Sequence, residues 1–394
     1  MKLLFTIIVP NSFIFSNTLM SNVQKRLLEQ LEKRQENKNL RTLKLIQNLI
    51  DFSSNDYLGL SSNEKLMASI LESYAATGLS MGSTGSRLLT GNSQLHLELE
   101  SKLAEFFGAP AALLFNSGYT ANLALISTIP QRGDTILYDQ AIHACIKEGA
   151  RLSQATYLSF RHNDPDDLSR KLKRSTGNKF VVVESLYSME GDAPPIRNII
   201  ALCRRFGAEL FIDEAHTTAW AGSEGKGWIV DQQLTQKFLA RVYTFGKGLG
   251  THGACIVGSQ ELIDYLINFA RPFIYTTALP PHSIISINCA LEFLKGHTSS
   301  GALLKEKISF YLQQAEKIKV EKSLNKNSPI QWIMTPGNKN ALAFSDYLKT
   351  SGFDVRPILS PTVPEGKERL RVCIHSFNTK EEILNLISSI VNRP

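Results

Sequence analysis

The sequence has few cysteines, and none of them lies close to another along the chain. Its 394 residues contain five, which lie far apart without a C-x-x-C motif: Cys145, Cys203, Cys255, Cys289 and Cys373. An odd number of scattered cysteines argues against a disulfide framework and against a zinc site, so we expect no bound metal. The same usage is typical of a reducing compartment, and we predict a cytoplasmic protein.

Long apolar runs are also absent, which predicts that no segment spans a membrane. The N-terminal stretch holds one lysine and a short apolar run that Pro10 interrupts, without a small-x-small cleavage site. We expect residues 1–19 to be a disordered tail or to precede the true start at Met20, and secretion is the weaker alternative. After Met20 the sequence predicts a helix whose apolar face consists of Val23, Leu27, Leu28 and Leu31.

Charge of one sign does not dominate the chain. It has 43 Lys and Arg residues against 36 Asp and Glu residues, a modest formal net charge of +7. A solvated basic surface explains this balance more readily than a nucleic-acid partner, so we predict no nucleic-acid binding. The hydrophobic fraction of 43% is ordinary for a protein that buries a full core. The length predicts one large domain with a smaller companion.

From about residue 100, short apolar runs alternate with segments of helical pattern. The runs that predict buried strands are 111–118, 134–139, 180–185, 209–215, 241–245 and 253–258. Such runs, separated by helices, predict an α/β fold with a largely parallel sheet that is covered on both faces. The tail from about residue 330 has the pattern of a smaller α/β unit. We divide the chain into an N-terminal arm and helix (20–60), a large domain (61–290) and a small C-terminal domain (291–394).

The segment ELFIDEAHTTAWAG (209–222) contains the letters D-E-A-H, which RNA helicases use to bind magnesium and ATP. A helicase also needs a phosphate-binding G-x-x-x-x-G-K-[ST] loop on an earlier strand. Gly225–Lys226 and Gly246–Lys247 both lack the upstream glycine, and a glycine follows each lysine. Without that loop the helicase interpretation fails.

The parts that pyridoxal phosphate needs are present instead. Lys247, just past a predicted strand and among glycines, can hold the cofactor aldehyde as a Schiff base. Asp213, at a strand end, can keep the pyridine nitrogen protonated, and Gly118 opens a helix whose N-terminus suits a phosphate. Singly, each has a structural alternative, such as a surface turn or a helix cap. Their order at the carboxyl ends of alternating strands favours the cofactor.

The chain resembles the α-oxoamine synthases, which are pyridoxal-phosphate enzymes, over roughly residues 23–390. The motifs that carry this resemblance are DFSSNDYLGL (51–60), GSTGSRLLTGN (82–92), LFNSGYTANLAL (114–125), SLYSMEGDAPP (185–195), IDEAHTT (212–218), TFGKGLG (244–250), NFARPFIYTTALPP (268–281) and SPTVPEGKERLRV (360–372). The resemblance implies the PLP-dependent transferase fold of aspartate aminotransferase (type I), with a large and a small domain. It also implies a homodimer with active sites at the subunit interface.

The resemblance also assigns cofactor contacts to residues at matching positions. Lys247 would hold the cofactor and move protons at the substrate Cα, while Asp213 pairs with the ring nitrogen and His143 stacks on the ring. Contacts to the phenolic oxygen are implied for Ser188 and His216. Phosphate contacts are implied for Gly118, Tyr119 and Thr244, and for Thr276 or Thr277 toward the neighbouring subunit.

Substrate contacts follow from the same resemblance. Arg371 would hold the amino-acid carboxylate, and a guanidinium suits that two-point contact. Arg41 and Thr362 align with acyl-substrate contacts, and His143 is expected to donate a proton to the oxyanion that develops on the acyl group. The segment 37–52 is shorter than the family leads us to expect, which predicts a differently shaped acyl entrance.

The segment FARPFIYTTALPP (269–281) most suggests the biotin branch of the family. That branch implies condensation of L-alanine with a pimeloyl thioester, carried by coenzyme A or an acyl carrier protein, to give 8-amino-7-oxononanoate and CO₂. The alternatives are glycine with acetyl-CoA, as in glycine C-acetyltransferase, or serine with a long acyl-CoA, as in serine palmitoyltransferase. A catalytically silent partner subunit is a third alternative.

Overall fold

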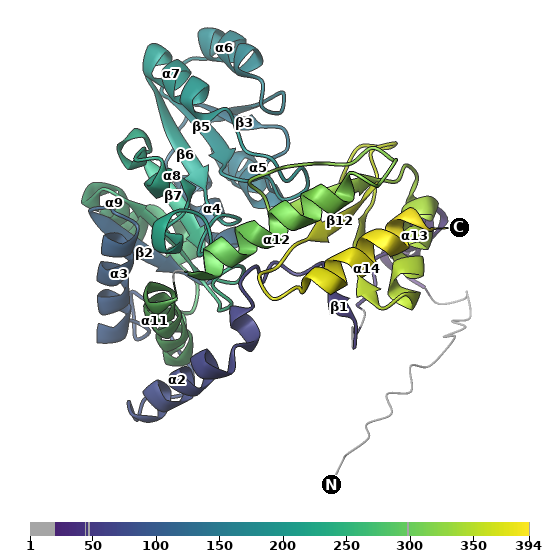
Figure 1. Cartoon of the computed structure of the whole chain (residues 1–394). Coiled ribbons are helices and arrows are strands. Elements are labelled where there is room, and N and C mark those ends of the chain that lie inside the picture. The colour runs from purple at the N-terminus through teal and green to yellow at the C-terminus, as the bar shows by residue number, and fades with distance from the viewer. Residues whose placement is uncertain (1–19, 44, 46–47, 298, 394) are drawn as a thin grey trace.

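The computed structural model describes residues 20–43, 45, 48–297 and 299–393 (Figure 1). The prediction for residues 1–19 lies outside this part of the chain. None of the described helices is both long and apolar enough to cross a membrane. The same residues contain no cluster of three or more His, Cys, Asp or Glu side chains suited to a metal ion.

A seven-stranded sheet forms the centre of the larger unit, with the strand order β2-β8-β7-β6-β5-β3-β4. Its strands are β2 (Ala111–Phe115), β3 (Thr135–Asp139), β4 (Thr156–Phe160), β5 (Lys179–Glu184), β6 (Ala208–Asp213), β7 (Ala240–Thr244) and β8 (Ala254–Gly258). β8 runs antiparallel to β2 and β7, and the remaining pairs are parallel. The largely parallel sheet predicted from the apolar runs is therefore present.

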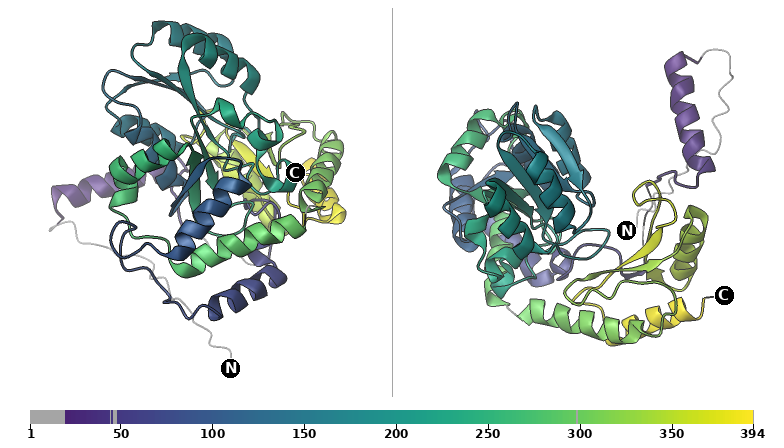
Figure 2. Two further views of the ribbon diagram at one scale, coloured as in Figure 1. Left: turned by 90° about the vertical axis from the view of Figure 1, so that its left-hand side faces the viewer. Right: turned by 90° about the horizontal axis from the view of Figure 1, so that it is seen from above.

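Helices cover both faces of this sheet (Figures 1 and 2). Side chains of α4 (Gly118–Thr128), α5 (Ala144–Leu152) and α9 (Gln260–Phe269) form one buried cluster with the strands. Side chains of α6 (Pro165–Arg174) and α7 (Ile196–Phe206) form another on the opposite face. The other elements of this unit are α2 (Glu64–Ala75), α3 (Gln94–Phe106), α8 (Trp228–Asp231), α10 (Arg271–Ile274), α11 (Pro281–Gly296) and the 3₁₀ helices Leu60–Ser62, Ser223–Gly225 and Thr235–Lys237. Burial on both faces explains why these strands are apolar throughout.

The smaller unit combines the C-terminal region with part of the N-terminal arm. Its antiparallel sheet has the order β11-β12-β9, and β1 pairs in parallel with β10. The elements are β1 (Ile50–Asp51), β9 (Ile330–Met334), β10 (Phe353–Asp354), β11 (Arg356–Ile358), β12 (Arg369–Cys373), α12 (Ser299–Ala315), α13 (Asn338–Thr350) and α14 (Lys380–Val391). In Figure 2 (right), α12 extends from the larger unit along the smaller one. The β1–β10 pair brings the segment after residue 50 beside the C-terminal unit.

The predicted N-terminal helix is present as α1 (Asn22–Glu36) and buries none of its side chains within the single chain. It stands away from the rest of the molecule in Figure 2 (right). Ser21 caps it, because its side chain accepts a hydrogen bond from the Gln24 amide at 3.2 Å. Between α1 and β1, the described residues (37–43, 45, 48 and 49) form no strand.

Candidate active site

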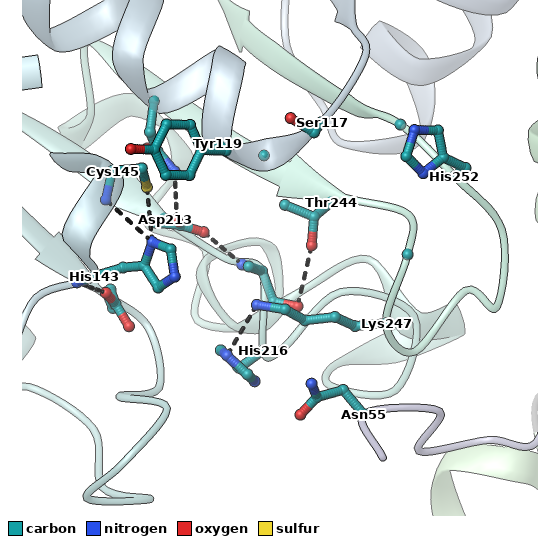
Figure 3. Close-up of a pocket in the computed structure, with 16 residues that line it drawn as sticks. Asn55, Ser117, Tyr119, His143, Cys145, Asp213, His216, Thr244, Lys247 and His252 are labelled. Atoms are coloured by element: carbon teal, nitrogen blue, oxygen red, sulfur yellow. Dashed lines mark hydrogen bonds between the residues drawn. The ribbon is translucent and has the colours of Figure 1, made fainter. Parts of the chain in front are cut away.

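A cavity of about 290 Å³ lies where β5, β6 and β7 end and α4 begins (Figure 3). Its lining includes seven of the residues proposed from the sequence: Gly118, Tyr119, His143, Asp213, His216, Thr244 and Lys247. They come from four separate strand-to-helix or strand-to-strand connections. The carboxyl edge of the parallel strands gathers them, as expected for an open α/β sheet.

Lys247 belongs to a chain of buried polar contacts. Its Nζ lies 2.9 Å from Nε2 of His216, and Nδ1 of His216 lies 2.7 Å from the Tyr57 hydroxyl. Burial lowers the pKa of Lys247, against the opposing effect of the carboxylates of Asp213 and Glu184. Burial also lowers the pKa of His216, so its ring is neutral. The arrangement favours a lysine that can act as a free amine.

Two hydrogen bonds fix the carboxylate of Asp213. Oδ1 accepts from the Ala215 amide at 2.7 Å, and Oδ2 accepts from the Asn122 side chain at 2.6 Å. Hydrogen bonds to both oxygens hold the carboxylate in one orientation. A buried, oriented negative charge at this position fits a protonated pyridine nitrogen.

The start of α4 forms a narrow cradle. Ser117 caps the helix, and its Oγ accepts from the Thr120 amide at 3.2 Å. A Cβ atom at position 118 would lie 2.3 Å from Cγ2 of Thr244, so only glycine fits without displacement. The free N–H groups of a helix N-terminus bind phosphate well. Tyr119 lies beside this cradle, and its hydroxyl donates to Glu148. The residues present therefore fit pyridoxal phosphate at its aldehyde, ring-nitrogen and phosphate ends.

His143 opens α5 and lines the cavity beside Glu184. The His143 amide donates to Oε1 of Glu184 at 2.5 Å. Burial raises the pKa of Glu184 to about 8, whereas burial lowers the pKa of His143. The ring of His143 is therefore neutral.

A second cavity of about 980 Å³ adjoins the first, and His143 lines both. Three other residues proposed from the sequence line this second cavity, namely Arg41, Ser188 and Thr362. Arg371 is buried on β12, where Nε donates to the Ser188 carbonyl and Nη2 donates to Oδ1 of Asn55, both at 2.8 Å. Asn55 lines the first cavity, so Arg371 lies at the border of the site.

Thr276 and Thr277 follow α10 and lie outside the lining of the first cavity in the described chain. The Asn116 side chain donates to Oγ1 of Thr276 at 3.2 Å and to the Thr277 carbonyl at 2.8 Å. Their role toward a neighbouring subunit remains a prediction. The contact of the Ser188 side chain with a phenolic oxygen also remains one, since Ser188 lines the larger cavity instead.

Several residues of the site were not singled out from the sequence, among them Asn55, Tyr57, Asn122 and Glu184. Asn122 lies four positions after Gly118, so the helical period places both on one face and could have revealed it. Glu184 pairs in register with Asp213 on the next strand, which was detectable once both strand ends were aligned. Asn55 and Tyr57 reach the site through the β1–β10 pairing, for which the local sequence gives no signal.

Residues 47–390 match the family described as aminotransferase class I and II. The chain belongs to this family. Within it, the chain is 39% identical over 366 residues to the 8-amino-7-oxononanoate synthase of Emericella nidulans. The aligned region covers 86% of this chain and 88% of that relative.

Solved structures give the same family and fold. A serine palmitoyltransferase from S. paucimobilis with a bound PLP–myriocin aldimine is similar with a TM-score of 0.86 and 25% identity, covering 94% of this chain and 98% of that one. The 8-amino-7-oxononanoate synthase of Francisella tularensis is similar with a TM-score of 0.74 and 30% identity, covering 87% and 97%. The predicted resemblance to α-oxoamine synthases, the PLP-dependent transferase fold and the assignment as an acyltransferase of that kind are confirmed.

Proposed function

We propose that the chain condenses L-alanine with a pimeloyl thioester to give 8-amino-7-oxononanoate, CO₂ and the free thiol, in biotin biosynthesis. The observation that carries the proposal is the pair of cavities that share His143. The smaller one holds Lys247 and Asp213, and the larger one has room for an acyl thioester beside Arg41. The 39% identity to a synthase of this kind supports the substrates.

Pyridoxal phosphate would be held at three points. Lys247 would bind the aldehyde carbon, Asp213 the ring nitrogen, and the N–H groups at Gly118 the phosphate. His216, whose Nε2 faces Lys247, would lie near the phenolic oxygen. When bound, the cofactor accepts the electrons of the substrate's Cα–H bond into its protonated ring.

The residues around it bind the amino acid and move its proton. Two guanidinium nitrogens of Arg371 suit the two oxygens of the alanine carboxylate. The free amine of Lys247 then removes the Cα proton, for which its lowered pKa is an advantage near neutral pH. Holding base and Cα together can contribute roughly 7–11 kcal/mol in favourable cases.

The acyl thioester would enter through the larger cavity. His143, which lines both cavities, donates a hydrogen bond to the oxygen of the thioester carbonyl as negative charge develops there. Arg41 would meet the terminal carboxylate of the pimeloyl chain. The Cα of alanine would form a C–C bond to the thioester carbonyl carbon, and the C–S bond would break to release the thiol. The resulting β-keto acid loses CO₂, and return of a proton to Cα leaves the aminoketone.

Mass spectrometry on the product tests this proposal. Purified protein with pyridoxal phosphate is supplied with L-alanine and pimeloyl-CoA, or with L-alanine and the pimeloyl carrier protein. Parallel reactions contain glycine with acetyl-CoA and serine with palmitoyl-CoA. We expect the mass of 8-amino-7-oxononanoate in at least one of the first two reactions. A product only in the glycine or serine reaction would assign the chain to that sister activity and refute the pimeloyl substrate.

One observation favours the serine reaction as the second candidate. The similarity to serine palmitoyltransferase has a TM-score of 0.86, against 0.74 for the 8-amino-7-oxononanoate synthase of Francisella tularensis. A long acyl chain would also need a large cavity. We rank it second because sequence identity to that enzyme is 25%, against 39% to the synthase of Emericella nidulans.

A further inference from the structure

The ring of His143 is held from one side by Cys145. His143 caps α5, and its Nδ1 accepts a hydrogen bond from the Cys145 amide at 3.3 Å. The Cys145 thiol lies 2.9 Å from the same Nδ1 (Figure 3). Cys145 is buried and lines the smaller cavity.

These two contacts determine which ring nitrogen carries the proton. The backbone amide of Cys145 can only donate, so its 3.3 Å contact favours a lone pair on Nδ1 of His143, and the closer thiol, at 2.9 Å, strengthens that preference. Burial raises the pKa of the Cys145 thiol, so this group is an S–H donor and not a thiolate. In a neutral imidazole with a bare Nδ1, the proton lies on Nε2.

The charges around the ring agree with a neutral imidazole. Burial lowers the pKa of His143, the Asp213 carboxylate opposes this shift, and any positive charge on Lys247 or Lys147 adds to it. Glu184 contacts the backbone amide of His143 and not the ring. Among the described residues, Nε2 of His143 has no hydrogen-bond partner, so its N–H is available to a substrate.

We propose that Cys145 is a positioning residue for the condensation, because it holds His143 as the Nε2–H tautomer and aims that N–H at the thioester carbonyl. This inference rests on the proposed function. A neutral imidazole stabilises the oxyanion as a fixed hydrogen-bond donor, as in other enzymes that use a neutral histidine electrophile. The proton remains on Nε2, and no bond of His143 is formed or broken.

The first test reads the tautomer directly. Full-length holoenzyme labelled with ¹⁵N-histidine is examined by long-range ¹H–¹⁵N correlation, and loss of one signal set in His143→Gln assigns the residue. We expect a protonated Nε2 and a bare Nδ1 in the wild type, with Nδ1–H increased in Cys145→Ala. A proton on Nδ1 in the wild type, or an unchanged tautomer in Cys145→Ala, would overturn the proposal.

The second test is kinetic and uses Cys203 as a matched control. Cys203 is also buried, but lies in α7 on the opposite face of the sheet. We expect Cys145→Ala to lower kcat by about tenfold to a hundredfold while KM for L-alanine changes little. Cys145→Ser keeps a hydrogen-bond donor at this position and should retain the wild-type kcat. Cys203→Ala should also leave kcat unchanged.

Three kinetic outcomes would overturn the proposal: wild-type kcat in Cys145→Ala, an equal loss in Cys145→Ser, or an equal loss in Cys203→Ala. If Cys145→Ala does not fold, Cys145→Ser and the wild-type tautomer still decide. If the wild type makes no aminoketone from any substrate pair, the proposed function fails, whereas the tautomer measurement still tests the geometry.

Discussion

Two lysines of this chain have glycine on both sides, but only one is buried in the site. Lys247 lies 2.9 Å from His216, whereas Lys226 pairs with Glu224 at 2.7 Å and is partly exposed. Lys247→Ala should lower turnover by roughly 10³-fold or more, the scale seen when a reacting group is removed. Borohydride should fix the cofactor to the peptide containing position 247 in the wild type and not in the variant, as peptide mass spectrometry would show.

Lys226→Ala is the matched control for this prediction and should retain wild-type turnover. Turnover that survives in Lys247→Ala would remove the proposed proton transfer. A wild type that carries no fixed cofactor would instead support the catalytically silent alternative.

Arg41 is an exposed residue at the edge of the larger cavity. If it meets the pimeloyl carboxylate, Arg41→Ala should lower kcat/KM for pimeloyl-CoA about fivefold, since an exposed ion pair contributes up to about 1 kcal/mol. With heptanoyl-CoA, which lacks the carboxylate, the variant should match the wild type. Lys367→Ala, which removes another cation from the same cavity, serves as the control. An equal loss with both thioesters would contradict a role in carboxylate recognition.

At the scale of elements, the junction of β7 with the start of α4 determines the phosphate cradle. Gly118→Ala would place a Cβ 2.3 Å from Cγ2 of Thr244. We expect the dissociation constant for pyridoxal phosphate to rise about tenfold or more, because an overpacked contact typically costs 1–3 kcal/mol. Thr244→Ser removes Cγ2 but keeps the hydroxyl, so the double variant should recover affinity.

Fluorescence titration of the apoprotein with the cofactor measures both variants. Gly296→Ala is the control, since a Cβ there would meet nothing within 4 Å. If the double variant binds no better than Gly118→Ala alone, the contact with Thr244 is not the cause of the loss.

A second junction joins the ends of β3 and β4 to the loop after β5. Nδ1 of His162 lies 2.8 Å from Asp139, and Nε2 lies 3.1 Å from Asp192. Burial alone would lower the pKa of His162, but the hydrogen bonds to the two carboxylates raise it to about 10. Because the folded-state pKa is raised above the ordinary value of 6.5, this contribution to stability is complete below pH 6.5 and is lost as pH rises through 10.

Urea unfolding at pH 7, 9 and 10 tests this coupling. Between pH 7 and pH 10, the free energy of unfolding of the wild type should fall by about 1–2 kcal/mol more than that of His162→Gln. Solvent screening of the partly exposed pair keeps this difference small. His282→Gln alters an exposed histidine, and its free energy of unfolding should depend on pH as that of the wild type does. Equal slopes in the wild type and His162→Gln would contradict the coupling.

Element prediction from the sequence worked best where strands are buried on both faces. The run FVVVES has a uniform apolar pattern, and the structure places β5 there within one residue. Strand β4 was missed because four of its five residues, Thr156–Ser159, are exposed, so no apolar run marks it. The antiparallel direction of β8 was not predicted either. It follows from the short connection after β7, which contains no crossover helix.

At the scale of the whole molecule, segments far apart in sequence complete the site. Tyr57 from the N-terminal arm contacts His216, and Arg371 from the C-terminal unit contacts Asn55. Strand order and apolar pattern located Lys247 and Asp213, because the carboxyl edge of a parallel sheet is common to all its strands. The contacts of Tyr57 and Asn55 depend on long-range pairing between units, which no local pattern encodes. The family resemblance supplied the role of Arg371 without its contacts.

The proposed homodimer makes a prediction about Thr276 and Thr277, which lie outside the cavity lining in their own described chain. If they bind the phosphate of the neighbouring subunit, a Thr276→Val/Thr277→Val homodimer should bind the cofactor weakly, and a Lys247→Ala homodimer should be inactive. A heterodimer of the two variants contains one site with an intact lysine and intact threonines. Two-fold symmetry then predicts about half the wild-type kcat per dimer, with wild-type cofactor affinity at that site.

Co-expression with two different affinity tags isolates this heterodimer for titration and kinetics. In the alternative arrangement, the threonines serve the lysine of their own chain. Every site of the heterodimer would then lack either the lysine or the threonines, and weak cofactor binding would persist at the lysine-containing site.

Because α1 exposes Val23, Leu27 and Leu31 on one side, covering this face in a dimer would also bury apolar surface that the single chain leaves in water. A chain that stays monomeric in light scattering at assay concentration would contradict both the shared site and this packing.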